Sequence, residues 1–181
     1  MTATRRWLPE GFFRPVEYAK PSSYRRPPAF YRHLKSIAPW ILRLGLAPSY
    51  VVQLDVAGRR TGVPRRSLLV QVTHDGADYL VSLAGESEWV RNVRAAGGDV
   101  LVTAHRRRRA AHLVEVPAGQ RPDIIRAYVN RPGSRGRAVA RTSEARHYFG
   151  IDPDASLAQI AQVADRYPVF RVDRRAGTPS R

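Results

Sequence analysis

Apolar and polar residues alternate in two stretches in the middle of the chain, at 51–56 and 68–72, and a third, largely apolar stretch follows at 79–84. A period of two residues is typical of a β-strand with one buried face. His74-Asp75-Gly76 separates the second stretch from the third, and its Asp-Gly pair favours a tight hairpin turn. Because short turns join these strands, we predict that they form an antiparallel meander.

Helical patterns occur on both sides of these strands. Apolar residues repeat every three or four positions between Phe30 and Leu44, which predicts a helix with a kink at Pro39. Further helices are expected at 86–96, 122–129 and 154–165, and further strands at 100–103, 110–116 and 169–172. No helix of crossover length joins consecutive strands, which argues against a doubly wound parallel sheet. We therefore predict an α+β fold, mainly antiparallel β, in which helices pack outside a small barrel.

The first residues differ from the rest of the chain. Residues 1–28 are rich in Arg, Pro and aromatic side chains and show no periodicity, so we predict an arm that lies over the domain. Residues 29–181 are predicted to form a single domain. The length of 181 residues and the hydrophobic content of 43% both suit one globular core.

Charge and composition narrow the classes of function. The formal net charge is +16, mostly from arginine, which favours an anionic partner such as nucleic acid, an acidic membrane face or an anionic cofactor. The absence of cysteine excludes disulfides, zinc held by cysteine and a thiol nucleophile. No signal sequence and no run of about 20 apolar residues is present, so we expect a cytoplasmic protein. Contact of the basic 30–44 helix with a membrane surface is the alternative to its packing in the core.

One connection between predicted strands concentrates arginine, glycine and proline: Gly58-Arg59-Arg60-Thr61-Gly62-Val63-Pro64-Arg65-Arg66. Guanidinium groups match phosphate and carboxylate oxygens, and glycine lets the main chain turn tightly. The spacing fits neither a P-loop nor a dinucleotide-binding fingerprint. Two interpretations stay open from these residues alone, an anion site on a β-turn and a solvated turn.

Three motifs in order resemble the deazaflavin (F420)-dependent nitroreductase family over roughly residues 45–118. They are the arginine turn, then Tyr79-Leu80-Val81-Ser82-x-x-Gly85, then Trp89-Val90-Arg91-Asn92-Val93-Arg94-Ala95. The resemblance implies a split β-barrel of the FMN-binding-like kind. It also implies an oxidoreductase that uses coenzyme F420, a deazaflavin whose tail carries a phosphate and glutamate carboxylates.

The resemblance assigns expected roles to residues at three places. The turn and the strand after it would bind the phosphate and tail through Arg59, Arg60, Thr61, Gly62, Arg65, Arg66 and Ser67. The end of the third strand would run along the deazaflavin ring through Ser82, Leu83, Ala84 and Gly85. Trp89 and Asn92 would close the site from one helix face. Glu86 and Glu88 depart from this pattern, because they put negative charge beside a site for an anion.

The implied reaction is hydride transfer from the reduced deazaflavin to a small electron-poor acceptor, a quinone, an enone or a nitro compound. A proton must follow the hydride. Tyr128, Tyr148 and Ser82 are the candidate catalytic residues, as proton donors or oxyanion stabilisers. For each tyrosine the alternative is packing in the core with a hydrogen-bonded hydroxyl.

Other functions remain as alternatives. The same barrel could hold FMN or haem, or serve a non-redox role. The arginine run at 106–109 is expected near a hairpin tip, but no aromatic residues are interleaved with it, so we expect no nucleic-acid partner. Five scattered histidines without metal-ligand spacing predict no metal. Because split barrels often pair, a homodimer is an expectation.

Overall fold

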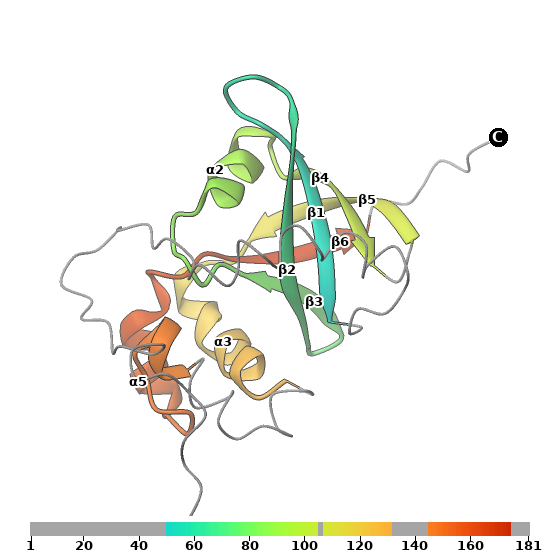
Figure 1. The fold of residues 1–181 in the computed structure, drawn as a ribbon. Helices are drawn as coiled ribbons and strands as arrows, with labels where there is room; N and C mark the ends of the chain where they lie inside the picture. Colours follow the sequence, from blue (N-terminus) through green and yellow to red (C-terminus); the bar gives the residue numbers. More distant parts are fainter. Residues whose placement is uncertain (1–49, 105–106, 132–144, 175–181) are drawn as a thin grey trace, which may run out of the picture.

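The computed structural model describes residues 50–104, 107–131 and 145–174. Six antiparallel strands close into a barrel in the order β1-β2-β3-β6-β5-β4 (Figure 1). The strands are β1 (Val51–Ala57), β2 (Pro64–His74), β3 (Ala77–Val81), β4 (Asp99–Ala104), β5 (Arg107–Glu115) and β6 (Val169–Arg174). The predicted α+β fold, an antiparallel split-barrel type with helices outside, is confirmed.

The predicted meander is β1, β2 and β3, each paired antiparallel with the next. The turn between β2 and β3 is made by Asp75 and Gly76, with φ of 47° and 76°. Such positive φ values are typical of a two-residue hairpin turn whose twist matches that of its strands. The turn sets the register in which His74 lies opposite Ala77.

One apolar core fills the barrel interior. Helix α2 (Glu88–Ala95) contributes Trp89, Val90 and Val93 to it, because these positions share one helix face. The strands supply the rest through alternate positions, which include Val52, Leu54, Val56, Leu80, Val100, Val102, Ala111, Leu113, Phe170 and Val172. These thirteen residues make a continuous buried cluster.

A second core lies outside the barrel. Helices α3 (Arg121–Val129) and α5 (Leu157–Ala164) pack on each other, and α3 also packs on β2 and β3 (Figure 1). A short 3₁₀ helix, η1 (Ala118–Gln120), leads into α3, and a π-helical turn, η2 (Ala145–Phe149), adds Phe149 to this core. A capping box of Ser156 and Gln159 begins α5.

The expected strands and helices within the described residues are present, with different bounds. β2 begins at Pro64 and β5 at Arg107, several residues earlier than predicted, because their arginines pair with neighbouring strands. Three of the four arginines of the 106–109 run therefore lie in a strand. β3 ends at Val81. The predicted arm at 1–28 and helix at 30–44 lie outside the described residues.

Among the described residues, every helix is too short or too polar to cross a bilayer.

Candidate functional site

The connection between β1 and β2, residues 58–63, is a tight loop closed by its own main chain. The Gly58 N–H donates to the Val63 carbonyl at 3.0 Å, and the Gly62 N–H donates to the Gly58 carbonyl at 2.8 Å. A Cβ at Gly58 would lie 2.9 Å from the Val63 carbonyl oxygen and 3.3 Å from Cγ of Arg65. Glycine at position 58 therefore lets the loop close while the Arg65 side chain lies across it.

Arg59 fastens this loop to helix α2. Oδ1 of the buried Asn92 accepts hydrogen bonds from the Arg59 main-chain N–H at 3.2 Å and from Nη1 at 3.3 Å. The same guanidinium forms an ion pair with Glu88, with Nη1–Oε2 at 2.5 Å and Nη2–Oε1 at 3.3 Å. Hydrogen bonding to Glu88 raises the pKa of Arg59, and the same bond lowers the pKa of the Glu88 carboxyl.

The other three arginines of the turn differ in their partners. Arg60 and Arg65 are exposed and form no ion pair among the described parts of the chain, although the charge of Arg60 helps to lower the pKa of Glu88. Arg66, in contrast, lies with Nε 3.3 Å from Oδ1 of Asp55, and Arg108 lies with Nη2 3.4 Å from Oδ2 of the same carboxylate. Asp55 is 5% exposed, so these two arginines screen a buried charge. The guanidinium groups of Arg60 and Arg65 are therefore accessible to an anion.

The small residues of the predicted site lie beside these arginines. Thr61 is exposed, and its Oγ1 accepts a hydrogen bond from the Val63 N–H at 3.4 Å. Gly62 is exposed with φ of 67°, a conformation that glycine adopts without strain. Ser67 is half-buried on β2, opposite Leu54 of β1.

The segment after β3, residues 82–87, is a compact turn built on two buried serines. Ser82 Oγ donates to the Gly85 carbonyl at 2.7 Å and lies 3.0 Å from Ser87 Oγ. Because a carbonyl only accepts, the Ser82 proton is directed at Gly85, and Ser87 is then the donor to Ser82. Leu83 and Ala84 are half-buried in the same turn.

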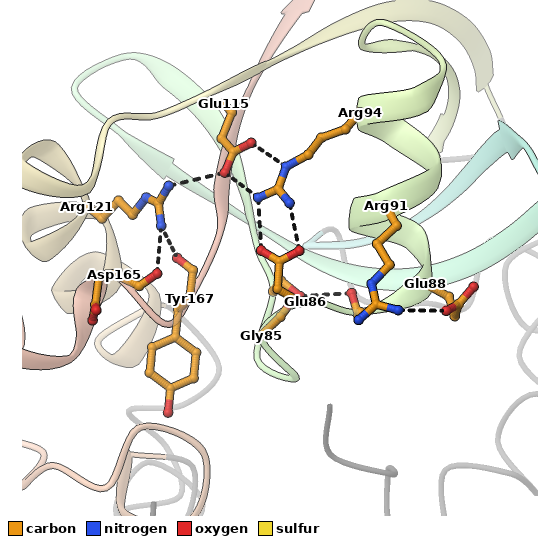
Figure 2. Close-up of polar contacts among 11 residues, drawn as sticks. Gly85, Glu86, Glu88, Arg91, Arg94, Glu115, Arg121, Asp165 and Tyr167 are labelled. Carbon is orange, nitrogen blue, oxygen red and sulfur yellow. Dashed lines mark hydrogen bonds and ion pairs between the residues drawn. The ribbon is translucent and has the colours of Figure 1, made fainter. Parts of the chain in front are cut away.

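A chain of ion pairs holds this turn against the rest of the fold (Figure 2). Glu86 binds Arg94 at the end of α2, with Oε2–Nη1 at 2.7 Å and Oε1–Nη2 at 3.0 Å. Arg94 also binds Glu115 of β5, with Nε–Oε2 at 2.7 Å and Nη2–Oε1 at 2.8 Å. These hydrogen bonds raise the pKa of Arg94, first through Glu115, and lower the pKa of Glu115, first through Arg94.

Arg121 ends this chain in the outer core, where it is only 8% exposed. Its Nη2 reaches Glu115 at 3.2 Å and its Nε donates to the Val116 carbonyl at 2.8 Å. Its Nη1 lies 3.3–3.4 Å from three carbonyl oxygens where α5 ends and β6 begins, those of Ala164, Asp165 and Tyr167. Burial lowers the pKa of Arg121, although Glu115 opposes this, and the group stays protonated.

The remaining predicted residues lie in the two cores. Trp89 packs inside the barrel with its ring centre 5.4 Å from that of Phe170. Tyr128 is buried on α3, with its ring centre 6.1 Å from that of Phe149. Tyr148 is half-buried, and its carbonyl accepts a hydrogen bond from another tyrosine hydroxyl. The structure thus brings the arginine turn to α2 and keeps the tyrosines in the helical layer (Figure 1).

A family model for F420H2-dependent quinone reductase matches residues 24–144, more than half of the chain. The chain belongs to this family. The predicted resemblance to F420-dependent reductases is confirmed. As a member of the F420H2-dependent quinone reductase family, the chain is an oxidoreductase whose coenzyme is F420.

Three solved structures are also similar to the chain, at low identity. A chain described as a domain-swapped dimer is 16% identical over 80% of this chain and 100% of its own, with a TM-score of 0.45. An F420-H2-dependent reductase, FDR-A, is 18% identical over 68% and 94%, with a TM-score of 0.42. The haem storage protein HutZ of Vibrio cholerae is 13% identical over 78% and 92%, with a TM-score of 0.43. A search of curated proteins gave no match.

The residues of the turn fit the anionic part of F420. Guanidinium groups bind phosphate and carboxylate oxygens through paired N–H donors, and the turn presents two of them without an acidic partner in the described chain. Because Gly58 has no Cβ, the Arg65 side chain can lie close against the loop. The chemistry of this donor set therefore suits phosphate and carboxylate groups.

The sequence interpretation left out the groups that organise the site. Glu88 is more than the unfavourable charge that the sequence predicts, because it pairs with Arg59 and lies 3.6 Å from Arg91. Its spacing of three residues from Arg91 on one helix was a readable signal. Glu115 and Arg121 gave no local signal, because they meet through the barrel topology.

Proposed function

We propose that this chain transfers a hydride from reduced F420 to a quinone, the acceptor class after which its family is named. The observation that supports the proposal most is the pair of exposed arginines, Arg60 and Arg65, on a turn that is fixed to α2 through Arg59 and Asn92. A turn fixed in this way holds cationic heads in place for an anionic tail, which reduces the entropy lost on binding.

The coenzyme, when bound, supplies the hydride, and the chain supplies binding and orientation. In this proposal Arg60 and Arg65 hold the phosphate and carboxylates, and the Thr61 hydroxyl is a further donor beside them, because the main-chain N–H groups of Thr61 and Gly62 already donate to the Gly58 carbonyl. The 82–87 turn would lie along the ring, kept in shape by its serine pair and by Glu86 bound to Arg94. Trp89 would support this turn indirectly, because its side chain fills part of the barrel interior.

A quinone takes up a proton as well as a hydride, so the site needs a donor. The Ser82 proton is directed at the Gly85 carbonyl, which leaves that hydroxyl to shape the turn. Tyr128 is 2% exposed, whereas Tyr148 is half-buried. We therefore favour Tyr148 as the donor, and Tyr148→Phe should lower kcat and remove a basic limb from its pH profile while leaving coenzyme affinity unchanged.

The direct test is a pair of measurements with purified protein. Titration with F420 should quench the coenzyme fluorescence, and reduced F420 mixed with menadione should regain its oxidised absorbance. Losing two charge-assisted contacts in Arg60→Met/Arg65→Met should weaken F420 binding by about tenfold or more. Arg126→Met, on the exposed face of α3, is the matched control and should not weaken it.

Absence of both quenching and turnover in the wild-type protein would refute the proposal. An enone and a nitro compound run in the same assay test the other acceptors predicted from the sequence. Absorbance of FMN or haem in the purified protein would favour those alternatives instead. Pairing of two copies and contact with a membrane surface stay predictions, testable by light scattering and by vesicle flotation.

A further inference from the structure

Arg59 has two polar partners whose environments differ strongly. Asn92 is 5% exposed, lies near the middle of α2 and binds both the main-chain N–H and the guanidinium of Arg59. The side chain of Glu88 is 62% exposed and contacts only the guanidinium. Movement of Glu88 would therefore leave Arg59 in place on Asn92, with two N–H groups available.

Glu88 also has a second cation within reach. Its Oε1 lies 3.6 Å from Nη1 of Arg91, one helical turn further along α2 (Figure 2). Both residues are exposed, and pairs spaced by three residues on a helix are favourable neighbours. A small rotation of the Glu88 side chain toward Arg91 would exchange one ion pair for another without burying an unpaired charge.

We propose that Glu88 is an internal competitor for the coenzyme, because its carboxylate and the anionic tail share the Arg59 guanidinium. Binding of the tail transfers Glu88 to Arg91 and leaves Arg59 to the tail, with Asn92 as the fixed support. The inference depends on the proposed coenzyme site at the arginine turn and extends it, because Arg59 becomes a third guanidinium for the tail beside Arg60 and Arg65. Glu88 then lowers the affinity for F420, and Arg91 partly restores it by accepting the displaced carboxylate.

The sign of the effect distinguishes competition from support. Glu88→Gln removes the competing charge and should tighten F420 binding about three- to fivefold, measured by fluorescence titration. A Glu88 that merely held Arg59 in position would give weaker binding on the same substitution. Asp123→Asn is the matched control, because it removes an equal charge from an exposed ion pair on a helix, the pair with Arg126 on α3, outside the proposed site. It should change the Kd less than Glu88→Gln does.

Arg91→Gln provides a second, independent readout. It should weaken F420 binding when Glu88 is present and have little effect in the Glu88→Gln background, because no carboxylate then needs a new partner. Equal weakening in both backgrounds would show that Arg91 acts only as a nearby charge, and would overturn the exchange.

The two proposals fail in different ways. If wild-type protein does not quench F420 fluorescence, the coenzyme site is wrong and the exchange falls with it. If wild-type protein binds but Glu88→Gln binds no more tightly, only the competition is refuted. Thermal melts should show that every variant is folded, because Glu88 and Arg91 are exposed.

Discussion

Helix α2 carries an arginine–glutamate cluster at each end, and the two clusters differ in almost every other respect. At its start, Glu88 pairs with Arg59, and the Glu88 side chain is 62% exposed. At its end, Arg94 binds Glu86 and Glu115 together, and Glu115 is shared with the buried Arg121. The first cluster faces the arginine turn, and the second joins four segments of the fold.

The difference shows that burial and the number of anchors, rather than the kind of charge, decide what an ion pair does. An exposed pair is screened by water and gains little free energy from its geometry, so a ligand can replace one member. Removing one member of a buried pair leaves polar groups without partners. We therefore interpret the Arg59–Glu88 pair as exchangeable and the ion pairs that join Arg94, Glu115 and Arg121 as permanent.

The largest effect is expected at Arg121. Arg121→Met keeps much of the apolar stem but leaves Glu115 and several main-chain carbonyls without this donor. Loss of one partner in a buried network costs about 3–5 kcal/mol. We expect the free energy of unfolding, measured in urea, to fall by about that amount.

Arg126→Met is the control for this prediction. Arg126 lies on the same helix and pairs with Asp123 at 3.1 Å, but both side chains are about half exposed. Exposed pairs contribute about 0–1 kcal/mol, so this variant should stay close to wild type. An equal loss of unfolding free energy in Arg121→Met and Arg126→Met would show that burial does not decide how much an ion pair stabilises the fold.

A smaller loss of stability is expected from Gly58→Ala. This variant tests whether the main-chain closure of the 58–63 loop holds the exposed arginine turn in shape. The new methyl group would lie 2.9 Å from the Val63 carbonyl oxygen, so the loop must shift. Overpacking of this kind costs about 1–3 kcal/mol. Because Arg65 lies over the same space, F420 binding should weaken as well.

Gly76→Ala separates contact from backbone strain. Gly76 has φ of 76° in the β2–β3 turn, and a Cβ there would meet nothing within 4 Å. This variant should lose stability through strain alone and keep its affinity for F420. If Gly58→Ala binds F420 as tightly as Gly76→Ala does, then Arg65 does not depend on the loop closure.

Much of the fold could be predicted because its signals are local. Alternation predicted β1 and β2, and the Asp75-Gly76 pair predicted the hairpin turn and the strand β3 after it. The strand bounds were less predictable where arginine occupied ladder positions. Arg65 and Arg108 belong to strands because their main chains pair with Val56 and Thr103, which no side-chain pattern reveals.

The site was predictable only in part, for a related reason. The arginine turn could be found because its residues are contiguous, and Asn92 because it shares a helix face with Trp89. The partners that organise the turn and the segment after β3 come from separate segments. Glu115 contacts Arg94 and Arg121 only once the barrel closes and α3 packs against it. Nothing in the order of the sequence indicates these two contacts.

The stability that Glu115 contributes should depend on pH. Binding to Arg94 lowers the pKa of Glu115 in the folded protein below its ordinary value of 4.5. A depressed carboxyl pKa adds stability that is present above the unfolded value and is lost as the pH falls through the folded one. In Glu115→Gln, the difference in stability from wild type should be largest near neutral pH and shrink below about pH 4. Urea titrations across this range would check it, and a constant difference would contradict it.

The smallest effect on stability is expected at the Arg59–Glu88 pair, although its effect on binding should be easy to measure. Arg59→Met, Glu88→Gln and the double variant form a cycle whose coupling in urea unfolding should be close to zero, because the Glu88 side chain is 62% exposed and water screens its charge. When the same variants are compared for F420 affinity, the two single substitutions should have opposite effects. Arg59→Met should weaken binding, and Glu88→Gln should tighten it. A large coupling in the unfolding cycle would instead make Glu88 a permanent part of the fold, and the two ends of α2 would no longer differ in kind.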